Sequence, residues 1–319
     1  MSLPNKTNLL PDRPGIPPMA PMPEAETIDI PSLADSYARG DIDLICVLGP
    51  TASGKTKYAV QLAKEISRLR PLGSARNDNG CHFDQAKRND SGCHFDQAKG
   101  NDNGCHFDQA KRVEKSAVEI LSADSRQVYT GMDIGTGKDL REYGEVPYHL
   151  IDLVPAGSKF NIYQYQAAFA EAYADVRSRG AIPILCGGSG LYIESVTRAY
   201  KFDKENGVPA ERLPQKTFYI GTLVSREERV ERIDRRLDER LEEGLVEEVR
   251  GLLDSGIPPE DLLWYGLEYK FVTQYILGEI SYEEMRILLA NAIHQFAKRQ
   301  MTWFRGMERD GVRIHWVRP

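Results

Sequence analysis

The chain has 319 residues with 41 basic and 47 acidic side chains, so its formal net charge is −6. This length favours about two domains, and the acidic balance argues against broad, charge-driven binding of nucleic acid. No run approaches the roughly 18 consecutive apolar residues of a membrane helix, so we expect no membrane attachment.

The amino-terminal segment is rich in proline. Eight of the 18 prolines lie between Pro4 and Pro31, and the segment has neither the basic nor the apolar stretch of a signal peptide. This composition predicts a disordered leader over residues 1–40. Without an export signal, we expect a cytoplasmic protein whose cysteines are free thiols.

Short apolar runs then alternate with helical patterns. Strands are predicted at residues 43–48, 118–122, 148–154, 182–186 and 217–222. One helix is predicted after the first strand, ending near Pro71, and another over 163–179, where Gly180 provides a stop. Alternating strands and helices predict an α/β fold with a parallel sheet covered on both faces.

From Ser225 onward the pattern is almost wholly helical. We therefore expect an α/β core at 41–224 and a helical part at 225–319. The core is interrupted at 77–112 by a tandem repeat of period twelve, which begins NDNGCHFDQAKR.

Each repeat unit carries an adjacent Cys-His pair, namely Cys81-His82, Cys93-His94 and Cys105-His106. Zinc sites usually show C-x2–4-C or H-x3–5-H spacing, which a twelve-residue step does not provide. One Phe per unit is too little apolar surface for stacked repeats. We interpret the repeat as a disordered insertion, with metal or partner binding as the alternative.

A phosphate-binding loop is predicted after the first strand. The sequence GPTASGKT fits G-x4-G-K-[ST] between a strand and a helix. Loop amides and the helix N-terminus would hold phosphate oxygens. The predicted phosphate-binding residues are Gly49, Thr51, Ala52, Ser53, Gly54, Lys55 and Thr56, and Thr56 is the predicted Mg2+ ligand. A chance glycine turn is the alternative, and the motif leaves the kind of phosphate ligand open.

Polar residues also follow the other strands, at the edge where an open α/β sheet binds ligands. Asp124 could bind Mg2+ through water or accept a proton, and a simple turn cap is its alternative. Ser189 lies in a Gly-Gly-Ser-Gly turn, where its hydroxyl could donate to a phosphate oxygen. For His149 in the segment HLID, a structural core histidine is an equally good interpretation.

The segments GPTASGKT, SADSRQVYTGMDIGTGK, HLID and GGSGLY, in this order, resemble the tRNA dimethylallyltransferase (isopentenyltransferase) family. The segments WYGLEY at 264–269 and AKRQMTWFR at 297–305 agree with it. The resemblance runs from about Asp43 to Val317 apart from the repeat. It implies a P-loop NTPase-like fold and Mg2+-assisted transfer of a dimethylallyl group from its diphosphate to N6 of adenosine 37, in tRNAs that read codons beginning with U.

The resemblance also implies residue roles. The phosphate loop would hold the diphosphate of the prenyl donor rather than ATP, with Lys55 as a catalytic charge. Asp124 would accept the N6 proton, and Ser189, where the family usually has Thr, would assist the departing oxygen. Arg232 or Arg236 would contact the diphosphate, and Arg232 is our choice. The implied tRNA-binding residues are Asp124, Ser125, Arg126, Gln127, Gly266, Tyr269, Lys298, Arg299, Gln300 and Arg305.

Charge patterning in the helical part is compatible with RNA contact. On a helix predicted over 225–250, arginines at 229, 232, 236 and 240 share one face. The same helix carries ten acidic residues, so a solvated mixed-charge face is the alternative. Residues 298–319 hold six basic and two acidic side chains, the best candidate for a phosphate-backbone contact.

One departure from the family concerns RNA binding. Longer relatives insert a helical subdomain that grips the anticodon stem-loop, but here only Lys201–Lys216 separate Tyr200 from the next strand. We therefore expect a short form, acting as a monomer, that grips tRNA less or differently.

Three alternatives stay open. Prenylation of free AMP, ADP or ATP is favoured by the short connection and disfavoured by the basic AKRQMTWFR segment. A P-loop small-molecule kinase and a non-catalytic nucleotide-binding module are the others.

Overall fold

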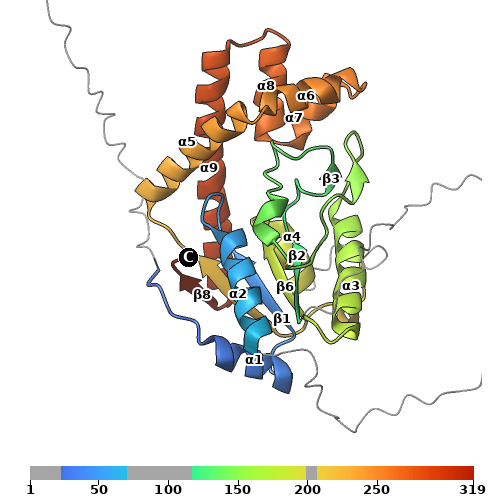
Figure 1. The fold of residues 1–319 in the computed structure, drawn as a ribbon, viewed down its shortest axis with the longest axis vertical. Coiled ribbons are helices and arrows are strands. Elements are labelled where there is room, and N and C mark those ends of the chain that lie inside the picture. Colours follow the sequence, from blue (N-terminus) through green and yellow to red (C-terminus); the bar gives the residue numbers. More distant parts are fainter. Residues whose placement is uncertain (1–22, 70–116, 199–206) are drawn as a thin grey trace, which may run out of the picture.

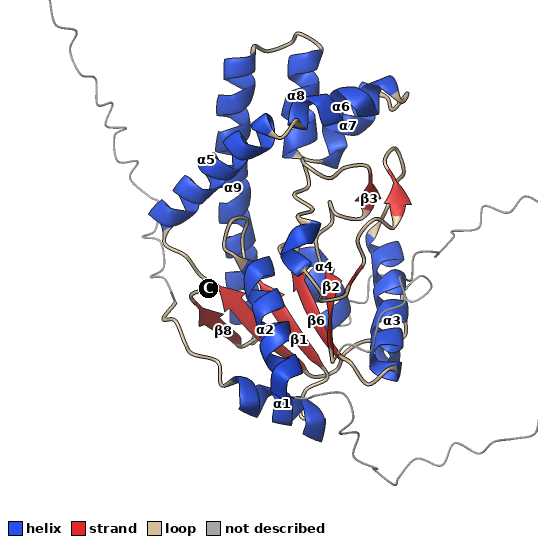
Figure 2. Ribbon diagram, in the orientation of Figure 1, coloured by secondary structure: helices blue, strands red, loops and turns tan. Residues whose placement is uncertain are grey.

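The computed structural model describes residues 23–69, 117–198 and 207–319. Its centre is a six-stranded parallel sheet in the order β4-β2-β6-β1-β7-β8 (Figures 1 and 2). The strands are β1 (Leu44–Leu48), β2 (Val118–Ser122), β4 (Tyr148–His149), β6 (Ile182–Gly187), β7 (Thr217–Thr222) and β8 (Ile314–Val317). The predicted parallel α/β sheet is confirmed.

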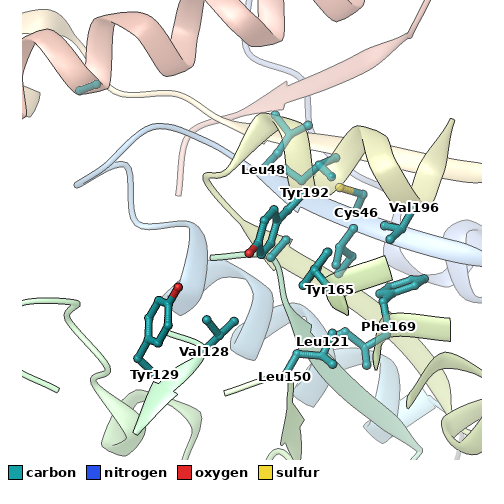
Figure 3. Packing of buried hydrophobic residues seen from close by; sticks show 14 of the residues in the cluster. Cys46, Leu48, Leu121, Val128, Tyr129, Leu150, Tyr165, Phe169, Tyr192 and Val196 are labelled. Atoms are coloured by element: carbon teal, nitrogen blue, oxygen red, sulfur yellow. The ribbon is translucent and has the colours of Figure 1, made fainter. Parts of the chain in front are cut away.

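Helices cover both faces of the sheet, as the uniformly apolar strands require. Successive side chains of a strand point to opposite faces, and the five residues of β1 are divided accordingly between two buried clusters. One cluster lies under α2 (Lys55–Leu69). The other packs against α3 (Ile162–Ser178) and α4 (Gly190–Thr197). In Figure 3 the Tyr165 and Tyr192 rings stack in that second cluster, with centroids 3.9 Å apart.

Part of the expected disordered leader is a helix, α1 (Ile30–Arg39). Asp29 caps its start, Leu33 and Ala34 are buried against α2, and Gly40 ends it with a φ of +76°. The prediction of disorder is wrong for this stretch, because Pro31 lies in the first turn, where proline is tolerated. Residues 1–22 lie outside the described part of the chain.

The third predicted strand, 148–154, is also corrected. Only Tyr148–His149 (β4) and the two residues of β5 (Val154–Pro155) are extended, and β5 pairs with β3 (Tyr129–Thr130). Between β4 and β5, Leu150 and Asp152 have φ of +66° and +58°. Two non-glycine residues in the left-handed region interrupt a strand. The apolar residues of this segment did not indicate the interruption.

The carboxyl-terminal part contains five α-helices, which extend from the level of the sheet to the top of Figure 1. They are α5 (Arg226–Glu242), α6 (Leu245–Asp254), α7 (Pro259–Tyr265), α8 (Leu267–Ile276) and α9 (Tyr282–Arg309). The single helix expected over 225–250 is wrong, because Gly244 with a φ of +103° separates α5 from α6. The expected helical end is otherwise confirmed, although α9 leads back to the sheet and the short strand β8 pairs with β7.

Two sequence features fall wholly or partly outside the described residues. The repeat at 77–112 lies outside them, as do residues 199–206 of the short connection before β7. The rest of that connection holds one 3-10 turn, Ala210–Arg212. In the part of the chain that the structure describes, no helix has the length and apolar character needed to cross a bilayer.

Candidate active site

The loop between β1 and α2 has the form of a phosphate-binding loop. Ala52 and Gly54 have φ of +62° and +80°, as a tight turn of this kind requires. The loop is fixed from behind, because the buried hydroxyls of Ser53 and Thr222 lie 2.6 Å apart. A Cβ at Gly49 would lie 2.2 Å from Thr222 Oγ1. The loop is therefore anchored to the end of β7 and is held open toward the opposite side.

A cavity of about 390 Å³ lies between this loop, the ends of β2 and β6, and helices α5, α8 and α9. The predicted site residues that line it are Thr51, Ala52, Gly54, Lys55, Thr56, Asp124, Ser125, Arg126, Gln127, Ser189, Arg299 and Gln300. Arg236, the alternative to Arg232 at the diphosphate, lines it as well. Residues without a predicted site role also line it, among them Gly135, Thr136, Gly137, Asp139, Glu142, Arg240 and Glu268. Three of them, Gly135, Thr136 and Gly137, belong to the glycine-rich segment at 131–138, which was a usable signal in the sequence.

Lys55 is the first residue of α2 and lines the cavity. Burial lowers the pKa of its ammonium group, and the Asp124 carboxylate opposes this shift without cancelling it. A bound anion would stabilise the charged ammonium further. The electrostatics of the site therefore favour a phosphate ligand.

Two arginines of α5 add positive charge at the opposite side of the cavity. Arg236 and Arg240 pack against Gly137, where a Cβ would lie 2.6 Å and 1.8 Å from their Nη2 atoms. Burial lowers the pKa of Arg240 to about 10, and Arg236 contributes to the lowering. The Glu268 carboxylate, 3.6 Å from Arg240, acts in the opposite direction. This concentration of cationic groups suits a multiply charged anion.

Arg232, the arginine chosen for the diphosphate, does not line this cavity. Its Nη2 atom lies 2.5 Å from Glu228 Oε1, one turn earlier on α5. Arg236 and Arg240 follow one and two turns later on the same helix. The spacing of the arginines predicts that they share one face of α5. Because a helix rises about 5.4 Å per turn, the same spacing does not show which turn of α5 meets the cavity. Arg236 and Arg240 line the cavity, whereas Arg232 lies beside the phosphate loop, with its Nη1 atom 3.6 Å from where a Cβ at Gly54 would be, so its contact with the diphosphate stays a prediction.

Asp124 lies just beyond β2 and lines the cavity together with Lys55. Its Oδ1 atom accepts a hydrogen bond of 3.0 Å from the Arg126 backbone. Asp124 therefore does cap its own turn, as the alternative interpretation has it. The same side chain also lines the cavity, so the two interpretations are compatible. Its role as the acceptor of a proton stays a prediction.

Ser189 joins two strand ends. Its hydroxyl accepts a hydrogen bond of 3.0 Å from the Ser125 backbone and donates one of 3.1 Å to the Ser125 hydroxyl. It also lines the cavity. Its assistance to a departing oxygen stays a prediction.

Tyr269 was assigned to tRNA, and the structure contradicts a surface role. The residue is 1% exposed, and its hydroxyl donates to Glu248 Oε1 at 2.8 Å. Glu248 also accepts the backbone amides of Asp133 and Ile134 at 2.7 Å each and of Gly135 at 3.0 Å. Tyr269 therefore supports the turn that forms one side of the cavity.

Gly266 and its neighbours lie against the Asp124 turn. A Cβ at Gly266 would lie 2.7 Å from Arg126 Nη1, which also donates to the Trp264 carbonyl at 3.4 Å. The Trp264 side chain is exposed, at 86%. Sequence reasoning did not single out Trp264, although the large aromatic residue within WYGLEY was a usable signal.

The basic segment after Lys298 is only partly at the cavity. Arg299 lines it and lies 5.9 Å from the Phe296 ring, whereas Lys298 and Arg305 do not line it. Gln300 is 8% exposed and bonds to backbone atoms of two loops. Because it also lines the cavity, its assignment to tRNA stays a prediction, although it presents little surface.

His149 takes no part in the cavity. Its Nε2 atom lies 2.6 Å from Glu119 Oε2, and Arg179 lies 2.7 Å from the same oxygen. These contacts with the buried Glu119 carboxylate support the structural interpretation of His149.

The parallel sheet, the loop between β1 and α2 and the cavity lined by Lys55, Arg236 and Arg240 define an α/β protein with a P-loop-like fold. The sequence profile of the IPP transferase family matches residues 127–217 and 202–307. The tRNA dimethylallyltransferase 2 of Bacteroides fragilis is 39% identical to this chain, over 87% of this chain and 93% of its own length. The tRNA dimethylallyltransferase 1 of Parabacteroides distasonis is also 39% identical, over 86% and 92%. The chain belongs to the IPP transferase family.

Solved structures agree with this assignment. The tRNA isopentenylpyrophosphate transferase of Bacillus halodurans superimposes with a TM-score of 0.62 at 25% identity, covering 86% of this chain and 89% of that one. The corresponding enzyme of Staphylococcus epidermidis gives 0.60 at 26% identity, covering 86% and 92%. The two profile matches overlap at 202–217, where the sequence shows its short connection.

Proposed function

We propose that this chain transfers a dimethylallyl group from dimethylallyl diphosphate to N6 of adenosine 37, in tRNAs that read codons beginning with U. One observation carries the proposal: the phosphate loop and Asp124 line the same cavity. A diphosphate leaving group and an adenine amine would therefore meet there. The names of the relatives, tRNA dimethylallyltransferases, support this substrate class.

The proposed reaction breaks the carbon–oxygen bond of the donor and forms a carbon–nitrogen bond to N6. The electron pair of the broken bond leaves with the diphosphate, and Asp124 accepts the proton released from N6. Lys55, Arg236 and Arg240 stabilise the charge that develops on the leaving group. Charge stabilisation of this kind is usually the largest catalytic contribution.

We extend the proposal to Mg2+, which prefers oxygen ligands from one or two carboxylates plus substrate phosphates. The Thr56 hydroxyl and the Asp124 carboxylate line the cavity and are donors of this kind. In the described ranges no group of three or more His, Cys, Asp or Glu side chains is placed to hold a metal. The ion would therefore complete its shell with the diphosphate, and when bound it would neutralise part of the leaving-group charge.

The target adenine must leave its stack to enter the cavity, as in other base-modifying enzymes. The anticodon loop is single-stranded, so its bases can be splayed onto aromatic side chains. Trp264, exposed beside Arg126, is placed to receive a neighbouring base. The cytoplasmic location and the monomeric state stay predictions.

The proposal is tested by offering the purified chain dimethylallyl diphosphate and Mg2+ with one of three acceptors. These are an unmodified tRNA that reads a U-initial codon, the same tRNA with guanosine at position 37, and AMP. Nucleoside mass spectrometry should detect isopentenyladenosine only with the first. Efficient turnover of AMP would instead support the free-nucleotide alternative. Lys55-dependent consumption of ATP without prenyl transfer would support a kinase.

Asp124→Asn should lower kcat for tRNA prenylation by about 10²- to 10⁴-fold, because the amide cannot accept the N6 proton. Circular dichroism should show that the fold is retained. Asp254→Asn, at an exposed position on α6, is the matched control. Wild-type turnover by the Asp124→Asn variant would contradict the assigned role.

A further inference from the structure

We propose that Gln300 is a positioning residue for the prenyl donor, because it holds the phosphate loop against the loop after β6. The inference rests on the proposed function, in which the phosphate loop binds the donor diphosphate. Gln300 Oε1 accepts a hydrogen bond of 2.8 Å from the Thr51 backbone amide. Gln300 Nε2 donates one of 2.9 Å to the Gly188 carbonyl.

These two bonds need a side chain that accepts and donates at once. A carboxamide does both, whereas a carboxylate only accepts and an ammonium only donates. Both bonds run from α9 to backbone atoms, one in the loop after β1 and one in the loop after β6. Gln300 thus links two loops whose other contacts are with different partners, Ser53 with Thr222 in the first and Ser189 with Ser125 in the second.

The space around Gly188 shows how closely these parts meet. A Cβ at Gly188 would lie 2.5 Å from Gln300 Nε2, 3.2 Å from the Gly49 carbonyl oxygen and 3.5 Å from Lys55 Cε. The Gln300 amide therefore lies beside the first glycine of the phosphate loop and the stem of its lysine. A shift of this amide would be transmitted directly to the groups proposed to hold the diphosphate.

The same geometry leaves Gln300 little surface for contact with RNA outside the cavity. At 8% exposure it presents little surface, and its carboxamide oxygen and nitrogen both have backbone partners. Arg299, the preceding residue, is exposed and lines the cavity. Adjacent residues on α9 thus serve different purposes.

Removal of the Gln300 amide should leave α9 docked, because a separate contact holds it one turn further on. Trp303 Nε1 donates to Glu194 Oε2 at 2.7 Å. A Cβ at Gly190 would lie 2.3 Å from Trp303 Cδ1, so this indole packs directly on the start of α4. The variants below should therefore fold.

The test uses the full chain with Gln300→Leu, which removes both bonds at similar volume, and Gly188→Ala, which displaces the amide from the other side. For each variant, KM and kcat are measured for dimethylallyl diphosphate and for tRNA. Dissociation constants are measured for the unreactive donor analogue dimethylallyl thiodiphosphate and for tRNA. Thr302→Val is the control, because Thr302 is exposed and its hydroxyl bonds only to its own helix, at the Lys298 carbonyl.

We expect kcat/KM for the donor to fall about 10- to 100-fold in either variant, the size of effect that slight misplacement of reacting groups produces. The dissociation constant for tRNA should stay unchanged. The double variant should be no worse than the more impaired single variant, because both changes remove one shared contact. Weaker tRNA binding with unchanged donor kinetics would overturn the inference, and so would unchanged donor kinetics alone.

A Lys55→Met variant separates this inference from the proposed function. If Lys55→Met binds the donor analogue as the wild type does, the loop does not hold the diphosphate and the proposed function fails. If Lys55→Met loses donor binding while both Gln300→Leu and Gly188→Ala keep wild-type donor kinetics, only the positioning role of Gln300 fails.

Discussion

At the scale of single residues, several glycines mark places where a side chain from a distant element meets the backbone. Gly135 lies under the Tyr269 ring, Gly137 under the arginines of α5, and Gly188 beside Gln300. The sequence showed these glycines as turn signals only. Their partners lie about 100 residues or more away along the chain. Single-residue reasoning therefore located the turns and not the contacts that require them.

Glu119 provides a test of buried electrostatics at this scale. Burial by itself raises the pKa of its carboxyl, but hydrogen bonds from His149 and Arg179 bring the pKa below its usual value. The folded state therefore binds this proton less readily than the unfolded state. The resulting stabilisation is present above the ordinary glutamate pKa of about 4.3 and is lost as pH falls through the folded-state pKa.

We expect Glu119→Gln to lower the free energy of unfolding at pH 7 by about 1–3 kcal/mol, because Arg179 and His149 lose their carboxylate partner. The difference from wild type should shrink as pH falls below about 4. Urea unfolding between neutral pH and pH 3 measures this, with the exposed Glu145→Gln as control. A difference that stays constant with pH would contradict the cluster's assigned role.

At the scale of elements, regular segments were predictable and irregular ones were not. The strands β2 and β7 occupy the predicted residues, and α3 lies within one residue of its prediction, because a capping box at Asn161 and Gln164 defines its start. The segment 148–154 was misassigned because Leu150 and Asp152 leave the extended region. Asp152 accepts a hydrogen bond from the buried Lys138, a partner that local sequence does not reveal.

Helix α7 provides a test at this scale, since it presents Trp264 at the edge of the site. Stacking of a base on an aromatic side chain contributes about 1–3 kcal/mol. Trp264→Ala should therefore weaken binding of an anticodon stem-loop about 5- to 100-fold and leave donor binding unchanged. Fluorescence anisotropy with labelled RNA measures this effect. Trp264→Phe should recover much of the affinity.

Leu263→Ala is the matched control, because Leu263 is the neighbouring exposed apolar residue on α7. Equal RNA affinity for wild type and Trp264→Ala would show that this indole does not stack on the substrate.

At the scale of the whole molecule, the cavity belongs to two parts of the chain. The α/β core supplies the phosphate loop and Asp124, whereas α5, α8 and α9 supply Arg236, Arg240 and Gln300. The helices from 226 to 309 lie between β7 and β8, two adjacent strands of the sheet. Both ends of the helical part are thus anchored in the core. Ion pairs between α5 and α9, such as Arg286 with Asp238 at 2.8 Å, hold its two ends together.

The repeat at 77–112 lies in the connection between α2, which ends at Leu69, and β2, which begins at Val118. Such connections ordinarily need only a few residues, and those that remain after deletion of the repeat are sufficient. We expect the deletion variant to keep wild-type kcat/KM for prenyl transfer and an unchanged thermal midpoint. A folded deletion variant without activity would refute this, and stoichiometric zinc binding by the full chain alone would support the metal-binding alternative.

The sequence by itself determined the parallel α/β core, the phosphate loop and the acid that follows β2. These features depend on local rules, namely apolar periodicity, glycine spacing and the position of strand ends. Only the tertiary structure decided which arginines of α5 face the cavity, that Tyr269 and Gln300 are buried, and that β8 completes the sheet. Those outcomes depend on the rotation and depth at which helices distant in sequence pack against the core, and no local pattern encodes either quantity.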